Sequence, residues 1–184
     1  MKHFALILVL FCACSQETAD TTSTTVTSPA GEGATPPPPT LTPGDREFAD
    51  TAARSGMAEV QLATNVASRA TSPEVRAFAQ QMIADHNRSN EELTTLAARK
   101  GLDPPADLEP EKKALDEELA KLTGPALDRK YMEEMVKDHA VAMARFESAA
   151  RELADADFRA FAEKTLPTLR QHHHLAEQLA AKVR

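Results

Sequence analysis

FAQQMIADH, residues 78–86, and YMEEMVKDH, residues 131–139, are the two stretches that decide the fold of this chain. Each begins with an aromatic residue, has a methionine in fifth place and ends in an Asp-His pair. Apolar residues that recur at steps of three and four lie on one face of an α-helix, because a helix turns once in 3.6 residues. Each stretch therefore predicts an amphipathic helix whose apolar face continues into a histidine, His86 in one and His139 in the other.

The same spacing extends outward from both stretches and predicts further helices. Thr42-Pro43 and Ser72-Pro73 are helix start signals, because a hydroxyl caps the first turn and proline suits its first position. We expect long helices at about 43–70, 73–101, 126–153 and 158–183, and a short helix at 111–122. Stacking two hairpins covers all four apolar faces. The prediction is an all-α, ferritin-like four-helix bundle over residues 44–184, with a longer connection between its second and third long helices.

The first residues have the pattern of an export signal. Lys2 precedes an apolar run, Phe4–Phe11, which is far shorter than the roughly 20 residues that span a bilayer. Ala13-Cys14 resembles a lipobox, although Phe11 stands where leucine is usual, and Ser15 after the cysteine favours the outer membrane by the same resemblance. We expect residues 1–14 to be a lipoprotein signal peptide, Cys14 to carry lipid and the protein to lie at the periplasmic face of the outer membrane. Plain secretion is the alternative.

Residues 15–43 are rich in Thr, Ser, Pro, Gly and Ala and predict a disordered tether, because such a segment buries little apolar surface. Both cysteines, Cys12 and Cys14, belong to the signal, so the folded domain has neither a disulfide nor a thiolate metal site. Residues 44–184 carry 20 basic and 25 acidic side chains, without a basic stripe. This balance argues against a nucleic-acid partner.

A polar layer interrupts the apolar faces. On the four long helices in turn, the residues that continue these faces are Glu59, His86, His139 and His172. At 1.5 Å per residue, each lies roughly 18 to 24 Å from the turn of its own hairpin. All four side chains can therefore lie in one layer of the core. Of the triplet His172–His174, only one or two members can face inward, because successive residues turn by about 100°.

Three interpretations of this layer stay open. Three imidazoles and one carboxylate are a competent ligand set for one Zn, Fe or Cu ion, with Asp85 and Asp138 as outer partners. A Glu–His hydrogen-bonded network that fixes helix register is the second, and exposure of half of the residues by helix rotation is the third. Ile83 and Val136 occupy the places where a di-iron bundle needs carboxylates, which argues against a ferroxidase.

Several motifs carry a resemblance to a known family. These are Gly56-Met-Ala-Glu59-Val, the residue 78–86 stretch, Asp128 through His139, and Thr165-Leu-Pro167 followed by His172. Together they resemble the domain-of-unknown-function 4142 family. The resemblance implies an exported, ferritin-like helical bundle and brings no established activity.

Two functions from different classes follow. One is an envelope-anchored lipoprotein that binds a metal ion through Glu59, His86, His139 and His172. The alternative is a non-catalytic structural or protein-interaction module of the periplasm. An enzyme has the least support, because the sequence has no nucleophile motif, no phosphate loop and no carboxylate pair at glycosidase spacing.

Overall fold

The computed structural model describes residues 40–103 and 105–184 of the chain. The signal peptide, Cys14 and most of the predicted tether lie outside the described residues, so those expectations stay predictions. All regular structure in the described part is helical. The helices are α1 (Pro43–Ala67), α2 (Pro73–Arg99), α3 (Pro110–Lys121), α4 (Gly124–Glu152) and α5 (Ala156–Lys182).

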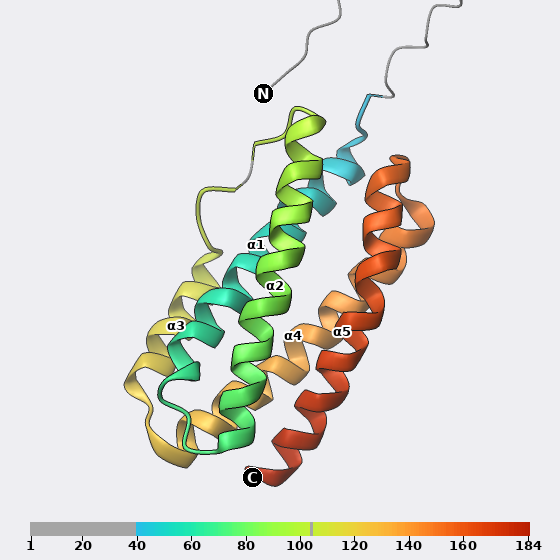
Figure 1. Ribbon diagram of the computed structural model, residues 1–184. Helices are drawn as coiled ribbons and strands as arrows, with labels where there is room; N and C mark the ends of the chain where they lie inside the picture. The colour runs from blue at the N-terminus through green and yellow to red at the C-terminus, as the bar shows by residue number, and fades with distance from the viewer. Residues whose placement is uncertain (1–39, 104) are drawn as a thin grey trace, which may run out of the picture. The chain divides into compact units, whose positions relative to one another are not determined.

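The four long helices form two antiparallel hairpins, α1–α2 and α4–α5, which pack side by side (Figure 1). Helix α1 contacts α4, and α2 contacts α5. The short helix α3 packs against α1 and α4 and returns the chain to the end of the bundle from which α2 started. As a result α2 and α4 run in the same direction, which is the crossover topology of ferritin-like bundles. The predicted all-α, ferritin-like fold is confirmed.

Side-chain caps determine where the helices begin. Thr42 and Asp45 form a reciprocal capping box at the start of α1, and the Ser72 hydroxyl accepts the backbone N–H of Val75 at the start of α2. Helix α5 begins two residues earlier than predicted, because the Asp155 carboxylate accepts the N–H groups of Asp157 and Phe158.

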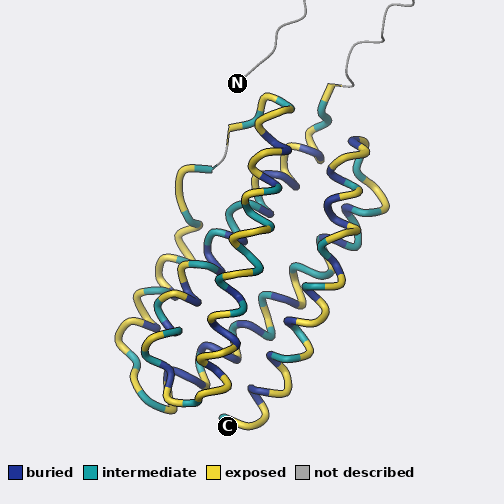
Figure 2. Tube along the Cα trace, in the orientation of Figure 1, coloured by how far each residue is buried: buried dark blue, intermediate teal, exposed yellow. Residues whose placement is uncertain are grey.

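Buried residues recur along each long helix (Figure 2), and the apolar ones divide into two clusters along the bundle. One is built around Leu62, Met82, Tyr131, Met135 and Ala176. The other contains edge-to-face phenylalanine rings and is built around Phe48, Leu93, Phe146, Phe158 and Leu169. In every long helix the predicted polar residue falls between the two clusters. The polar layer therefore separates them.

Two buried aspartates join the helix ends. Asp128 of α4 accepts the backbone N–H groups of Thr71 and Ser72, so it holds the α1–α2 turn against the second hairpin. At the other end of the bundle, Asp45 accepts the N–H of Asp155. These contacts set the register of the two hairpins. No helix among the described residues is long and apolar enough to cross a membrane.

Candidate metal centre

Three histidine rings from three helices meet in the polar layer. His86 comes from α2, His139 from α4 and His172 from α5. Their ring centroids lie 5.4 to 5.8 Å apart, and one ligand atom from each lies within 4.8 Å of the other two. His172 is buried, whereas His173 is half-buried and His174 is exposed. One member of the triplet therefore faces inward, as the helical turn requires.

Hydrogen bonds fix the tautomers of two of these rings. The Nδ1 atom of His139 lies 2.9 Å from the carbonyl oxygen of Met135, one turn earlier in α4. The Nε2 atom of His172 lies 3.0 Å from Oδ2 of Asp85. Carbonyl and carboxylate oxygens accept, so these ring nitrogens carry the protons. His139 Nε2 and His172 Nδ1 then keep bare lone pairs, as metal ligands do.

One nitrogen of each ring is buried and has no partner. His139 Nε2, His172 Nδ1 and His86 Nε2 are each inaccessible to solvent and make no hydrogen bond within the described part of the chain. Buried polar atoms of side chains are nearly always paired, because an unpaired one costs about 1–3 kcal/mol. Three such atoms in one cluster therefore require an explanation, and a shared ligand supplies one.

Burial also keeps the rings neutral. It lowers the pKa of His86 to about 3, with further lowering by the neighbouring rings of His139 and His172. It lowers the pKa of His139 to about 4, although the bond to Met135 opposes the shift. The pKa of His172 is lowered by burial as well, and the nearby Asp85 carboxylate opposes this. Neutral imidazole is the form that binds a metal.

Glu59 faces the same layer from α1 and does not belong to the three-histidine group. It is buried, and its Oε2 atom has no hydrogen-bond partner. Burial, together with the nearby Asp138, raises the pKa of Glu59 to about 8, so the carboxyl group is largely protonated at neutral pH. No hydrogen bond joins Glu59 to a histidine in the part of the chain that the structure describes. The structure therefore offers no support for the Glu–His network, and burial of Glu59, His139 and His172 argues against rotation of the layer to the surface.

The two aspartates that precede histidines have different positions. Asp85 does not orient its neighbour His86 but bonds His172 across the bundle, because adjacent residues of a helix point about 100° apart. Burial raises the pKa of Asp85, and the hydrogen bonds from His172 and Gln81 outweigh it, so the net shift is downward. Asp138 pairs with Lys112 of α3, and no hydrogen bond joins it to a histidine among the described residues.

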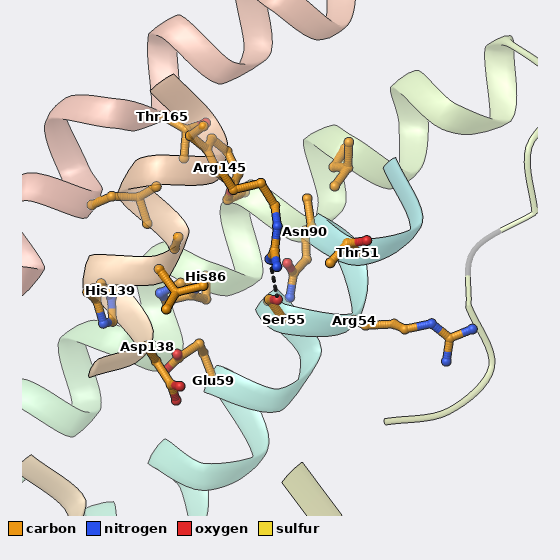
Figure 3. A pocket seen from close by; sticks show the side chains of 18 of the residues that line it. Thr51, Arg54, Ser55, Glu59, His86, Asn90, Asp138, His139, Arg145 and Thr165 are labelled. Atoms are coloured by element: carbon orange, nitrogen blue, oxygen red, sulfur yellow. Dashed lines mark hydrogen bonds between the residues drawn. The ribbon is translucent and has the colours of Figure 1, made fainter. Parts of the chain in front are cut away.

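A cavity of about 330 Å³ leads to this layer from the side of α1 (Figure 3). His86, His139, Glu59 and Asp138 line its inner part. Val141, which is 58% exposed, also lines it, so the cavity reaches the surface. The cavity thus connects solvent with two of the three histidines and with the carboxyl groups of Glu59 and Asp138.

Sequence reasoning missed four residues of this region. Lys112 lies on the short helix α3, where no sequence pattern indicates a site, and it pairs with Asp138. The side chain of Asn90 on α2 packs directly against Gly56 of α1. Arg145 extends from α4 toward Ser55. The sequence pattern marks Tyr131 only as the aromatic residue that begins the 131–139 stretch. Its hydroxyl is buried without a partner in the described part of the chain, and burial near Glu59 raises its pKa well above the usual range.

Fold and site define a class of protein, a ferritin-like helical bundle with a histidine layer in its core. A family model for the domain of unknown function DUF4142 matches residues 30–179, and the chain belongs to that family. The predicted membership is confirmed.

Two solved structures share the fold. A DUF305 fragment from Deinococcus radiodurans is 18% identical in sequence, with a TM-score of 0.70, over 78% of this chain and 99% of its own. A DUF305 protein from Streptomyces coelicolor, described as secreted by inference, is 14% identical, with a TM-score of 0.64, over 76% of this chain and 93% of its own. At these identities the likeness establishes the fold alone. No curated protein matches the sequence.

Proposed function

We propose that this protein binds one transition-metal ion through His86, His139 and His172, and that it does so in the bacterial envelope, where lipid on Cys14 anchors it. The observation that carries the proposal is the convergence of three unpartnered, buried imidazole nitrogens from three helices. A hydrogen-bonded structural layer would instead pair those nitrogens with donors.

The spacing of the rings is compatible with an ion. Zn–N bonds of about 2.0–2.1 Å in a tetrahedral site set the nitrogens roughly 3.3 Å apart. The ligand atoms of the three histidines lie within 4.8 Å of one another, so the rings need to close by about 1.5 Å at most. Small changes of ring torsion and helix position supply a movement of that size.

The ligand chemistry favours zinc or copper. Neutral imidazoles suit Zn and Cu, whereas Mg and Ca prefer oxygen ligands. Ferrous iron commonly adds a carboxylate to two histidines, and Glu59 on the same cavity is the candidate for that role. The bond from His172 to Asp85 is the outer contact that metal-bound histidines usually make.

A fourth position at the ion would face the cavity. Structural zinc sites are closed by four protein ligands, whereas sites with three protein ligands keep a position for water or another small molecule. Here α2, α4 and α5 each supply one histidine and α1 supplies none, so the side toward α1 and the cavity stays open. A site of this kind fits reversible binding or buffering of metal.

The envelope location rests on the signal and tether patterns. The lipobox-like Ala13-Cys14 and the Pro-rich segment that follows support lipid attachment and a tether. The Streptomyces relative described as secreted by inference is in keeping with export. Globomycin, which blocks lipoprotein signal cleavage, should make the full-length precursor accumulate, and Cys14→Ser should prevent labelling by a palmitate analogue.

Elemental analysis tests the metal site. The protein is purified without a histidine tag, loaded with Zn²⁺ or Cu²⁺ and desalted, beside His139→Ala and the matched control His174→Ala. His174 is exposed, and Gln178 is its one hydrogen-bond partner among the described residues. About one ion per chain in the wild type and in His174→Ala, lost in His139→Ala with the helical circular dichroism kept, is the expected result. No retained ion in the wild type would overturn the proposal and leave the layer as a structural feature.

A further inference from the structure

The cavity beside the histidines has the features of a binding site for a small organic molecule. Its volume of about 330 Å³ lies at the lower end of the range of about 300–1,000 Å³ that is typical of ligand pockets. Buried Leu93, Phe146 and Phe161 form an apolar wall, and Ser55 and Asn90 add polar groups. Apolar walls with a few placed polar groups are the usual composition of such pockets.

Arg145 distinguishes this cavity from a simple packing gap. Three basic side chains line it, and two of them are paired with carboxylates: Arg54 with Asp50 and Glu109, and Lys112 with Asp138. Arg145 extends from α4 across the cavity, where its Nη1 lies 3.4 Å from the Ser55 hydroxyl (Figure 3). No carboxylate pairs with it among the residues that the structure describes.

The chemistry of the ligand follows from this arrangement. A guanidinium has five N–H donors in a planar fork that matches a carboxylate. One unpaired cation suits a monoanion better than a phosphate, and the aromatic wall suits an apolar body. We propose that the cavity binds a small monocarboxylate with a short aliphatic chain, held by Arg145 and Ser55 and covered by Phe146 and Phe161.

This binding does not require the metal. Arg145 lies six residues beyond His139 on α4 and takes no part in the proposed ligand set. A carboxylate held by Arg145 and Ser55 would share with the proposed ion only the cavity that His86 and His139 also line. The proposal therefore goes beyond the metal site and can fail independently of it.

Ligand-observed NMR on the metal-free protein tests the proposal with butanoate and, as the uncharged analogue, butanamide. We expect butanoate to bind at least tenfold more tightly than butanamide, because a charge-assisted hydrogen bond contributes more than a neutral one. Arg145→Gln should lose that preference. Arg129→Gln, the same charge change at an exposed position of α4, should keep it.

Three results would overturn the proposal. These are equal affinity of the wild type for butanoate and butanamide, unchanged butanoate binding by folded Arg145→Gln, and stronger competition by inorganic phosphate than by any aliphatic carboxylate. Arg145→Lys keeps the charge without the fork and should bind with intermediate affinity, which guards against loss of folding in the glutamine variant. His172→Ala removes a proposed metal ligand that does not line the cavity and should leave carboxylate binding intact, so the outcome is separate from that of the metal test.

Discussion

His172 of α5 donates its Nε2–H to Oδ2 of Asp85 of α2 across 3.0 Å, which leaves Nδ1 of the same ring bare inside the core. This bond links the two hairpins of the bundle and also fixes the orientation of a proposed metal ligand. Asp138, the corresponding aspartate before His139, makes no contact of this kind. The pair of aspartates therefore offers a matched comparison.

Asp85→Asn should weaken metal binding by about 10- to 100-fold, the usual effect of losing an outer partner of a ligand histidine. Asp138→Asn should weaken it much less, because Asp138 pairs with Lys112. Competitive titration with a chromogenic zinc chelator measures both constants. Equal losses in the two variants would contradict a specific role for the bond between Asp85 and His172.

Glu59 should make the metal-free protein less stable as the pH rises. Its pKa is 4.5 in the unfolded reference and about 8 in the fold, so between these values the unfolded state releases a proton that the native state retains. Stability from this group is fully present below pH 4.5 and is lost progressively up to about pH 8. Each pKa unit corresponds to about 1.4 kcal/mol.

Glu59→Gln removes the titrating group and should flatten this part of the pH profile. We expect the free energy of unfolding of the variant to exceed that of the wild type by a few kcal/mol at pH 8, and by much less at pH 5. Urea unfolding at both pH values, in the presence of a chelator, gives the comparison. A variant that shows the same decline as the wild type between pH 5 and 8 would rule out Glu59 as its source.

Bound metal should survive mild acid. Protons compete with the ion for the imidazole lone pairs, and burial lowers the pKa of His86 to about 3 and that of His139 to about 4. Competition at these two rings therefore begins well below the usual histidine value of 6.5. Zinc should remain bound at pH 5 and leave near pH 4, as followed by dialysis and elemental analysis. Complete release at pH 6 would show that the rings are more accessible to protons than their burial indicates.

Gly56 and Asn90 should behave as a coupled pair. A Cβ atom at residue 56 would lie 1.9 Å from Oδ1 and 2.9 Å from Cγ of Asn90, so Gly56→Ala forces the amide to move. We expect Gly56→Ala to lower the free energy of unfolding by about 1–3 kcal/mol, the usual cost of overpacking. In an Asn90→Ala background the same change should be neutral or stabilising by up to about 1 kcal/mol, because alanine favours helix over glycine. Thermal unfolding of the four proteins tests this, and additive effects would contradict it.

Local sequence patterns were sufficient to predict the fold. The apolar residues spaced by three and four around Met82 and Met135 predict the helices. The proline-containing start signals predict where two of the helices begin, and the long connection predicts the crossover. The heights of Glu59 and the histidines gave the layer, since all four lie between the two clusters of the core.

The contacts within the layer were not accessible from the sequence. Which helix face meets which neighbour depends on packing between hairpins, so the sequence does not show that Asp85 reaches His172 and not the adjacent His86. Lys112 lies on a helix without a strong pattern, and nothing in the sequence shows that it would pair with Asp138. Arg145 resembles any surface cation of an amphipathic helix until the cavity beside it is seen.

The three histidines are divided between the hairpins, with His86 on the first and His139 and His172 on the second. An ion held by all three would cross-link the two hairpins, each of which is formed by helices close together in the sequence. This cross-link could form only after the hairpins had packed together, and it would then restrict their separation. Metal content would then report on completed assembly of the bundle, and a chain that had not finished folding would carry no ion.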